Sequence, residues 1–381
     1  MRGFHIGYRH KLEQGRAGRL SSKPLDFAGG YMTKRRFEDI DGNWVFITPI
    51  ANVVLTEAVN REFRIGRVLF VHGRKLPHIR RRLGLRSTVS DLKASFPVKS
   101  FQEFFGLSDV FAVVIQRGKP DPVESACYKL ISDAISLLSL SQLGYSRRRS
   151  SAQIAIHGQH GPDRSSRVLI QKDGVGKSFG GKYTRGLMPL TLNAQWKRWQ
   201  REVFFFKLIK LLFEEDSIDR SWREDLRVAS TLVGQSVNTR DVVSAFLWNM
   251  IALERLLTRR NDEVSSALPA RTEAFLGWVG YWEVGRYKER MRDIYRKRSA
   301  LVHAGAREDI APRDVLFTDE ILLNLLSNLV NLSRLFPSKQ HVVDFANKVE
   351  AERILGTRPR VRPGKLHYIG QSSRDEDFGE I

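Results

Sequence analysis

The chain has 381 residues, of which 42% are hydrophobic, so it is long enough to bury a core and to form two domains. Its formal net charge of +21 exceeds what solubility requires and favours a polyanionic partner, either nucleic acid or an acidic membrane surface. The single cysteine, Cys127, excludes an internal disulfide framework and a zinc site built from several thiolates.

The N-terminal stretch "MRGFHIGYRHKLEQGR" is basic but lacks the apolar centre of a signal peptide. No later window approaches a membrane span without charges. We therefore expect a soluble cytoplasmic protein without a membrane partner, and the lone cysteine suits that reducing compartment.

Short segments rich in β-branched and aromatic residues predict strands in the first half of the chain. They are "NWVFITPIANVVL", "RIGRVLFVHG", "DVFAVVIQRG", "AQIAIHG" and "RVLIQKDG". Among them, "DPVESACYKLISDAISLLSL" starts with an Asp-Pro helix signal and repeats apolar residues every three or four positions, which predicts an amphipathic helix with Cys127 buried on it. Residues 1–190 are therefore expected to form an α+β domain that ends in the loop "DGVGKSFGGKYTRGLMPL".

Two short motifs in this half resemble ligand sites but lack essential parts. "GVGKS" has Gln171 where a phosphate-binding loop needs glycine, and "FGGKYTRG" after it does not predict the helix that such a loop requires. "HGQHG" offers two histidines but no third ligand at a metal-binding spacing, so we interpret it as a surface turn. We expect no cofactor and no metal.

Three basic runs could bind phosphate groups: "YMTKRRF", "HIRRRLGLR" and "YSRRRSS". Any one such run is more often a solvated face of the protein. Their sum across the chain is the more informative signal, because the electrostatic part of nucleic-acid binding grows with the number of phosphates neutralised.

From residue 191 to residue 356 the strand signals vanish, and successive helix patterns predict an all-α helical bundle. "NAQWKRWQREVFFFKLIKLLF" predicts one helix, and "NTRDVVSAFLWNMIALERLLTRR" predicts another that is capped by Asn238 or Thr239. "TDEILLNLLSNLVNLSRLF" predicts a third, capped by Thr318 or Asp319, and "HVVDFANKVEAERIL" a last one. Residues 357–381 are expected to form a mobile tail.

An arginine followed five positions later by a histidine occurs three times, although about one match is expected by chance. The pairs are Arg67 with His72, Arg298 with His303, and Arg362 with His367. The first pair lies in a predicted buried strand and the third in the predicted tail. Only Arg298 and His303 lie at the end of a predicted helix, which begins near Arg286 and stops at Gly305.

Five residues of helix turn through about 500°, which leaves the Arg298 and His303 side chains about 140° apart around the axis and about 7.5 Å apart along it. They cannot share one face of the helix. Two copies facing each other across a twofold axis could line a shared cleft with both residue types, so the spacing favours a homodimer.

Three separated segments resemble HEPN domains, specifically the Apea-like branch that is often found in bacterial phage-defence proteins. They are "IALERLL", "YRKRSALVHAG" and the leucine-rich helix from Thr318 onward, and the resemblance covers about Trp222 to Leu335. HEPN ribonucleases often carry Asn, Asp or His after the arginine, where this chain has Ser299. The first half matches no family by motif.

The resemblance implies metal-independent cleavage of RNA by 2′-hydroxyl attack within a homodimer, in a role such as abortive infection. His303 would exchange a proton and Arg298 would stabilise the phosphorane charge. Ser299 could donate a hydrogen bond to the phosphate or could simply face solvent.

Two supporting residues have open assignments. Glu254 lies among apolar neighbours, where an unpaired carboxylate is costly, so it should pair either with an arginine such as Arg298 or, at the surface, with Arg255 or Arg259. Tyr295 is expected to pack in the core.

Two alternatives to the ribonuclease remain. A catalytically inactive HEPN dimer could serve as a nucleic-acid or protein binding module. The charge would also permit a DNA-binding regulator, although the first half shows no helix-turn-helix signature.

Overall fold

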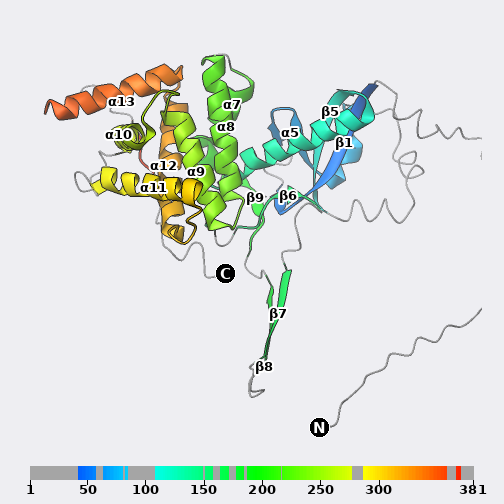
Figure 1. The fold of residues 1–381 in the computed structure, drawn as a ribbon. Helices are drawn as coiled ribbons and strands as arrows, with labels where there is room; N and C mark the ends of the chain where they lie inside the picture. Colours follow the sequence, from blue (N-terminus) through cyan, green and yellow to red (C-terminus); the bar gives the residue numbers. More distant parts are fainter. Residues whose placement is uncertain are drawn as a thin grey trace, which may run out of the picture.

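The computed structural model describes residues 42–56, 63–79, 82–84, 108–148, 151–157, 164–170, 177–183, 187–215, 217–276, 286–357 and 366–369. A part built on strands precedes a mostly helical remainder (Figure 1), which confirms the predicted order of α+β and helical regions. The strands are β1 (Gly42–Ala51), β2 (Val53–Leu55), β3 (Phe63–Ile65), β4 (Val68–His72), β5 (Val110–Gly118), β6 (Ala155–Ile156), β7 (Arg164–Ile170), β8 (Lys177–Tyr183) and β9 (Leu190–Leu192).

The helices lie around and after the sheet. They are the 3-10 turn η1 (Gly73–Lys75), α2 (Leu76–Ile79), α5 (Pro120–Leu140), α6 (Ala194–Glu202), α7 (Phe205–Phe213), α8 (Arg220–Val237), α9 (Val242–Leu257), α10 (Val264–Leu276), α11 (Arg286–Ala304), α12 (Pro312–Asn331) and α13 (Lys339–Ile354). In the described parts of the chain, no helix combines the length and the apolar character needed to cross a membrane.

The main sheet has the strand order β3-β4-β5-β1-β6, and its long central pair, β1 and β5, is antiparallel. Alternate residues of β5 enter two different cores, as the period of a strand requires. Ala112 and Val114 join the main core with α5, whereas Phe111 and Val113 join a smaller cluster on the other face. The strand is buried on both faces, which explains its continuous apolar sequence.

Two predicted strands are each divided by a backbone turn. Asn52 has a φ of 64°, which separates β1 from β2, and β2 then pairs in parallel with β9. Gly66 has a φ of 55° and allows the tight turn between β3 and β4. The single strands predicted there are wrong because hydrophobicity alone does not report a bend or a reversal of the backbone.

The region around the two rejected ligand motifs is only partly described. Lys177 and Ser178 of "GVGKS" begin β8, which pairs with β7, so a strand follows the motif and not the helix of a phosphate-binding loop. Part of the predicted loop is therefore strand. His157 is exposed at the end of the described segment 151–157, and the rest of "HGQHG" lies outside the described residues.

Three helix boundaries differ from the prediction. The helix expected over 193–213 is two helices, α6 and α7, because the backbone leaves helical geometry at Val203 and Phe204. The N-cap of α9 is Asp241, whose carboxylate accepts a hydrogen bond from the Ser244 amide at 3.0 Å, and not Asn238 or Thr239.

Helix α12 begins at Pro312, six residues before the predicted caps. The Asp314 carboxylate accepts a hydrogen bond from the backbone amide of Ala311, the N-cap residue, at 2.9 Å and so stabilises the start of the helix. Thr318 and Asp319 are buried inside the helix, where their side chains make tertiary contacts. The predicted start is wrong because the leucine run indicates the body of the helix, whereas Pro312 marks its first position.

One core runs continuously from the sheet into the helical part. Trp196 of α6 packs edge-to-face on Phe63 of β3, with ring centroids 5.6 Å apart. Helices α5 and α8 cross so closely at Gly234 that a Cβ there would lie 1.8 Å from the Ser136 carbonyl oxygen. The chain thus packs across residue 190 without a break in the described core.

The basic run "YSRRRSS" is not simply a solvated phosphate-binding face. The Arg148 side chain is 6% exposed, and its Nε and Nη2 atoms lie 2.5 and 2.6 Å from the two carboxylate oxygens of Asp319 on α12. Its guanidinium also donates to Ser236 on α8. The other runs, "YMTKRRF" and "HIRRRLGLR", lie wholly or partly outside the described residues.

Residues 366–369 lie against α12, so for them the prediction of a mobile tail is wrong. Leu366 is buried, and the backbones of His367 and Ile369 hydrogen-bond to the side chains of Asn328 and Asn324. The rest of the predicted tail after Thr357 is outside the described residues.

Candidate functional site

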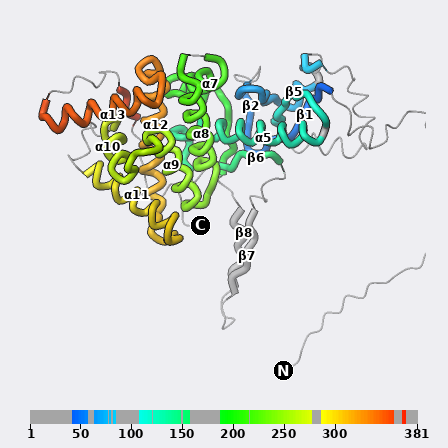
Figure 2. The backbone as a smooth tube through the Cα atoms, turned by 45° about the horizontal axis from the view of Figure 1, so that its top comes forward, coloured from blue at the N-terminus to red at the C-terminus, as the bar shows by residue number. Residues whose placement is uncertain are grey.

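Helix α11 carries the Arg298 and His303 pair. It packs inward through Tyr287, Met291 and Ile294, and both views place it at the outer edge of the helical part (Figures 1 and 2). It ends at Ala304, where Gly305 adopts a φ of 69° and its amide donates to the Leu301 carbonyl at 3.0 Å. The predicted stop of this helix is confirmed, and its described part begins at Arg286.

Arg298 is held by Glu254 from the neighbouring helix α9. The Nη2 atom of Arg298 donates to Oε2 of Glu254 at 2.9 Å, while Nε lies 2.9 Å from Oε1 but off the direction of a good hydrogen bond. Of the pairings that the sequence left open for Glu254, the structure contains the one with Arg298. Arg255 pairs instead with Asp225 at 2.7 Å, and Arg259 lies 3.6 Å from Asp344.

The pair is largely shielded from solvent, since the Arg298 and Glu254 side chains are 21% and 18% exposed. Burial raises the pKa of Glu254, although the charge and hydrogen bond of Arg298 oppose that shift. A guanidinium has five N–H donors, and Glu254 occupies the edge formed by Nε and Nη2. The remaining donors of Arg298 can bind a phosphate while Glu254 fixes the side chain.

His303 lies in the last turn of α11 and is exposed, so its imidazole is accessible to a ligand. Within the described residues it has no hydrogen bond or ion pair. Because both residues belong to one regular helix, Arg298 and His303 point about 140° apart around its axis. A single copy of α11 therefore does not bring the two side chains to one point.

The two remaining candidates occupy the same helix in different environments. Tyr295 is half-buried and packs against the main core, as expected. Ser299 is half-buried, follows Arg298 directly, and makes no side-chain hydrogen bond within the described residues. Its hydroxyl thus remains available.

Sequence reasoning missed a charge cluster between α11 and α12. The fully buried Asp314 carboxylate lies 2.6 Å from Arg290 and 2.9 Å from Lys297. Burial raises its pKa, but the Ala311 amide, Lys297 and Arg290 together lower it below the usual value. The "APRD" helix start, with Pro at the first position and Asp at the third, was the available signal. This cluster anchors the middle of α11 to α12.

The described part of the chain contains no group of His, Cys, Asp and Glu side chains that could hold a metal ion. Cys127 is buried on α5, as predicted, and its pKa is raised by burial. Neither observation adds a second candidate centre.

The chain was compared with protein-family models, with curated proteins and with solved structures, and no match was found in any of the three.

Proposed function

We propose that this protein is a metal-independent endoribonuclease of the HEPN type that acts as a homodimer. The observation that carries the proposal is the Arg298–Glu254 pair, which holds an arginine in place five residues before an exposed histidine at a helix end. The motif similarity supplies the family, and a role in phage defence is part of the proposal through that similarity alone.

The reaction needs few protein groups because RNA carries its own nucleophile. The 2′-oxygen forms a bond to phosphorus, the bond to the 5′-oxygen breaks, and one proton passes from the 2′-hydroxyl to a base while another passes from an acid to the 5′-oxygen. The products are a 2′,3′-cyclic phosphate and a 5′-hydroxyl. His303 supplies the proton exchange, and Arg298 stabilises the negative charge that accumulates on the non-bridging oxygens.

The dimer follows from the divergence of the two side chains. Two α11 ends that meet across a twofold axis place an Arg298 and a His303 from different copies around one phosphate. The outer position of α11 leaves room for such a contact. Val302, directly before His303, is 50% exposed and offers an apolar contact for the partner copy.

The second candidate is a catalytically inactive dimer that binds nucleic acid or protein. The observation in its favour is that Glu254 already neutralises Arg298, which is also what a purely structural ion pair would do. Both candidate functions assume the same dimer, and they differ in whether that dimer cleaves RNA.

Separate Arg298→Ala and His303→Ala changes test the enzyme. We expect each to reduce RNA cleavage in EDTA by at least about 100-fold, because each removes a distinct contribution to the transition state. The measurement is a gel assay of cleavage of a labelled RNA, with the cyclic-phosphate end checked by resistance to phosphatase.

Arg292→Ala is the matched control, since Arg292 is exposed on the same helix and makes no ion pair within the described residues. It should retain full activity. Light scattering should show the same dimer for all three variants. Cleavage that survives both site changes, or a wild-type dimer that binds RNA without cutting it, would remove the enzyme proposal.

A further inference from the structure

Helix α6 presents basic residues from a rigidly anchored backbone. Trp196 is fully buried and its Nε1 donates to Ser141 Oγ at 3.1 Å, while Gln200 donates to the Ser141 carbonyl at 2.6 Å. Asn193 caps the helix by accepting the Trp196 amide at 2.8 Å. These contacts fix the direction in which the opposite face of the helix points.

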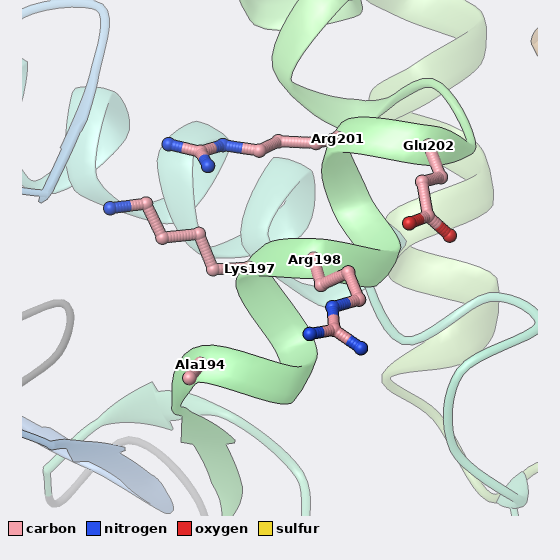
Figure 3. A pocket seen from close by; sticks show the side chains of 5 residues that line it. All are labelled: Ala194, Lys197, Arg198, Arg201 and Glu202. Carbon is pink, nitrogen blue, oxygen red and sulfur yellow. The ribbon is translucent and has the colours of Figure 1, made fainter.

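That opposite face lines an open depression of about 460 Å³. Its described lining consists of Ala194, Lys197, Arg198, Arg201 and Glu202. Figure 3 shows Lys197 and Arg201, one helical turn apart, extending side by side from the same side of α6, with Arg198 and Glu202 turned to the other side of the helix. The four-residue step separates Lys197 from Arg201 by about 6 Å along the axis.

The described lining has three cations and one carboxylate, that of Glu202, and so keeps a net positive charge. Within the described residues, Lys197, Arg198 and Arg201 make no ion pair and no side-chain hydrogen bond. The basic residues of α11 differ, because Arg290 and Lys297 share the Asp314 carboxylate. The cations of α6 are thus available to an anion from outside the chain.

We propose that the depression on α6 binds the phosphodiester backbone of single-stranded RNA. Lys197 and Arg201 would contact neighbouring phosphates, with Arg198 adding to the local potential. The described lining offers no aromatic face for a base to stack on, so the site would bind the backbone without selecting sequence.

The cations of α6 indicate that the ligand carries phosphate groups. That this ligand is RNA rests on the proposed ribonuclease function. The α6 depression would then be a substrate-holding site separate from the Arg298 and His303 residues that carry the reaction. Its loss should weaken binding without changing the chemistry at the cut.

The test measures RNA binding in the full-length His303→Ala protein, so that cleavage does not enter the readout. We compare Lys197→Gln/Arg201→Gln with the control Arg260→Gln/Lys348→Gln, which removes the same charge from exposed residues of the α9–α10 turn and α13. The probe is a labelled 20-nucleotide oligouridine, and its dissociation constant is measured by fluorescence anisotropy over a series of salt concentrations.

We expect the α6 double change to weaken binding about tenfold or more at low salt and to reduce the log–log salt slope by about 1.4, which is about 0.7 for each lost phosphate contact. The control double change should alter the dissociation constant and the salt slope much less. Unfolding midpoints should match for the two variants, since all four residues contact solvent.

Equal effects of the α6 and control changes would overturn the proposal, because the loss would then reflect net charge alone. Tighter binding of oligodeoxythymidine than of oligouridine would also overturn it, in favour of DNA. A wild-type protein that fails to cleave RNA would refute the proposed function but not this binding result.

Discussion

Two glutamates of the helical part differ in the surroundings of their carboxylates. Glu254 faces the Arg298 guanidinium. Glu320 of α12 lines a narrow space beside apolar and aromatic side chains. The other residues lining that space are Leu276, Tyr287, Phe317, Ile321 and Tyr368. Burial raises the pKa of Glu320 to about 7, since the ionised form loses its hydration there.

Glu320 should make the stability of the protein depend on pH. As pH rises from about 4.5 to about 7, the unfolded chain ionises this glutamate while the folded chain keeps it protonated. The favourable contribution of the protonated Glu320 to the free energy of unfolding is therefore complete below about pH 4.5. It is lost as the pH rises through about 7. We expect Glu320→Gln to raise the free energy of unfolding at pH 8 by about 1–3 kcal/mol relative to wild type, with little change at pH 4.5.

Urea unfolding at the two pH values measures this difference. Glu289→Gln is the control, since Glu289 is exposed on α11 and makes no hydrogen bond or ion pair within the described residues. An equal effect of Glu320→Gln at both pH values would contradict the raised pKa of the native carboxyl group.

At the scale of an element, α12 binds the segment 366–369 along one of its faces. Asn324 and Asn328, one helical turn apart, each accept an amide and donate to a carbonyl of the extended segment 366–369. The four distances lie between 2.6 and 3.1 Å. Because the partners are alternate residues, His367 and Ile369, the two amide side chains imitate the edge of a neighbouring strand.

The double change Asn324→Ala/Asn328→Ala should release this segment. It removes all four hydrogen bonds to the segment, at about 1 kcal/mol each, so the protection of the His367 and Ile369 amides against hydrogen exchange should fall by about 100-fold or more. Exchange measured by mass spectrometry on peptides covering this segment checks the prediction.

Asn261→Ala, at an exposed position in the turn before α10, is the control and should leave the exchange unchanged. Retained protection in the double variant would mean that the burial of Leu366, and not the asparagine ladder, holds the segment.

At the scale of the molecule, a buried polar network joins the segment after α5 to three helices. Arg148 reaches Ser236 of α8 and Asp319 of α12, and Asn249 of α9 donates to the same Asp319 at 2.8 Å. Every member is buried or nearly so, and the charges of Arg148 and Asp319 balance. The network fixes how the strand-containing part sits on the helices.

Arg148→Ala should destabilise the whole protein by about 3–5 kcal/mol, because it leaves Asp319 charged and buried without its counter-ion. Arg148→Met/Asp319→Leu removes both charges and should recover a large part of that loss. Urea unfolding of Arg148→Met alone, of Asp319→Leu alone and of the double variant completes a double-mutant cycle. A loss below about 1 kcal/mol for Arg148→Ala would show that the pair contributes little.

The candidate site was partly predictable. The sequence indicated that Arg298 and His303 end a helix, because the apolar period from Arg286 and the glycine at position 305 are local signals. It left the partner of Glu254 open, since that contact joins residues 44 positions apart. The α6 depression was missed because "WKRWQR" was interpreted only through its apolar stripe.

Periodicity and capping depend on neighbours within a few residues, so the order of strand and helix segments, the burial of Cys127 and the end of α11 follow from the amino-acid sequence alone. The burial of Arg148 on Asp319, 171 residues away, and the docking of 366–369 on α12 are seen only in the folded chain. The physical reason is that a charged or polar side chain is stable in the interior only beside a matching group, and folding alone brings remote groups together.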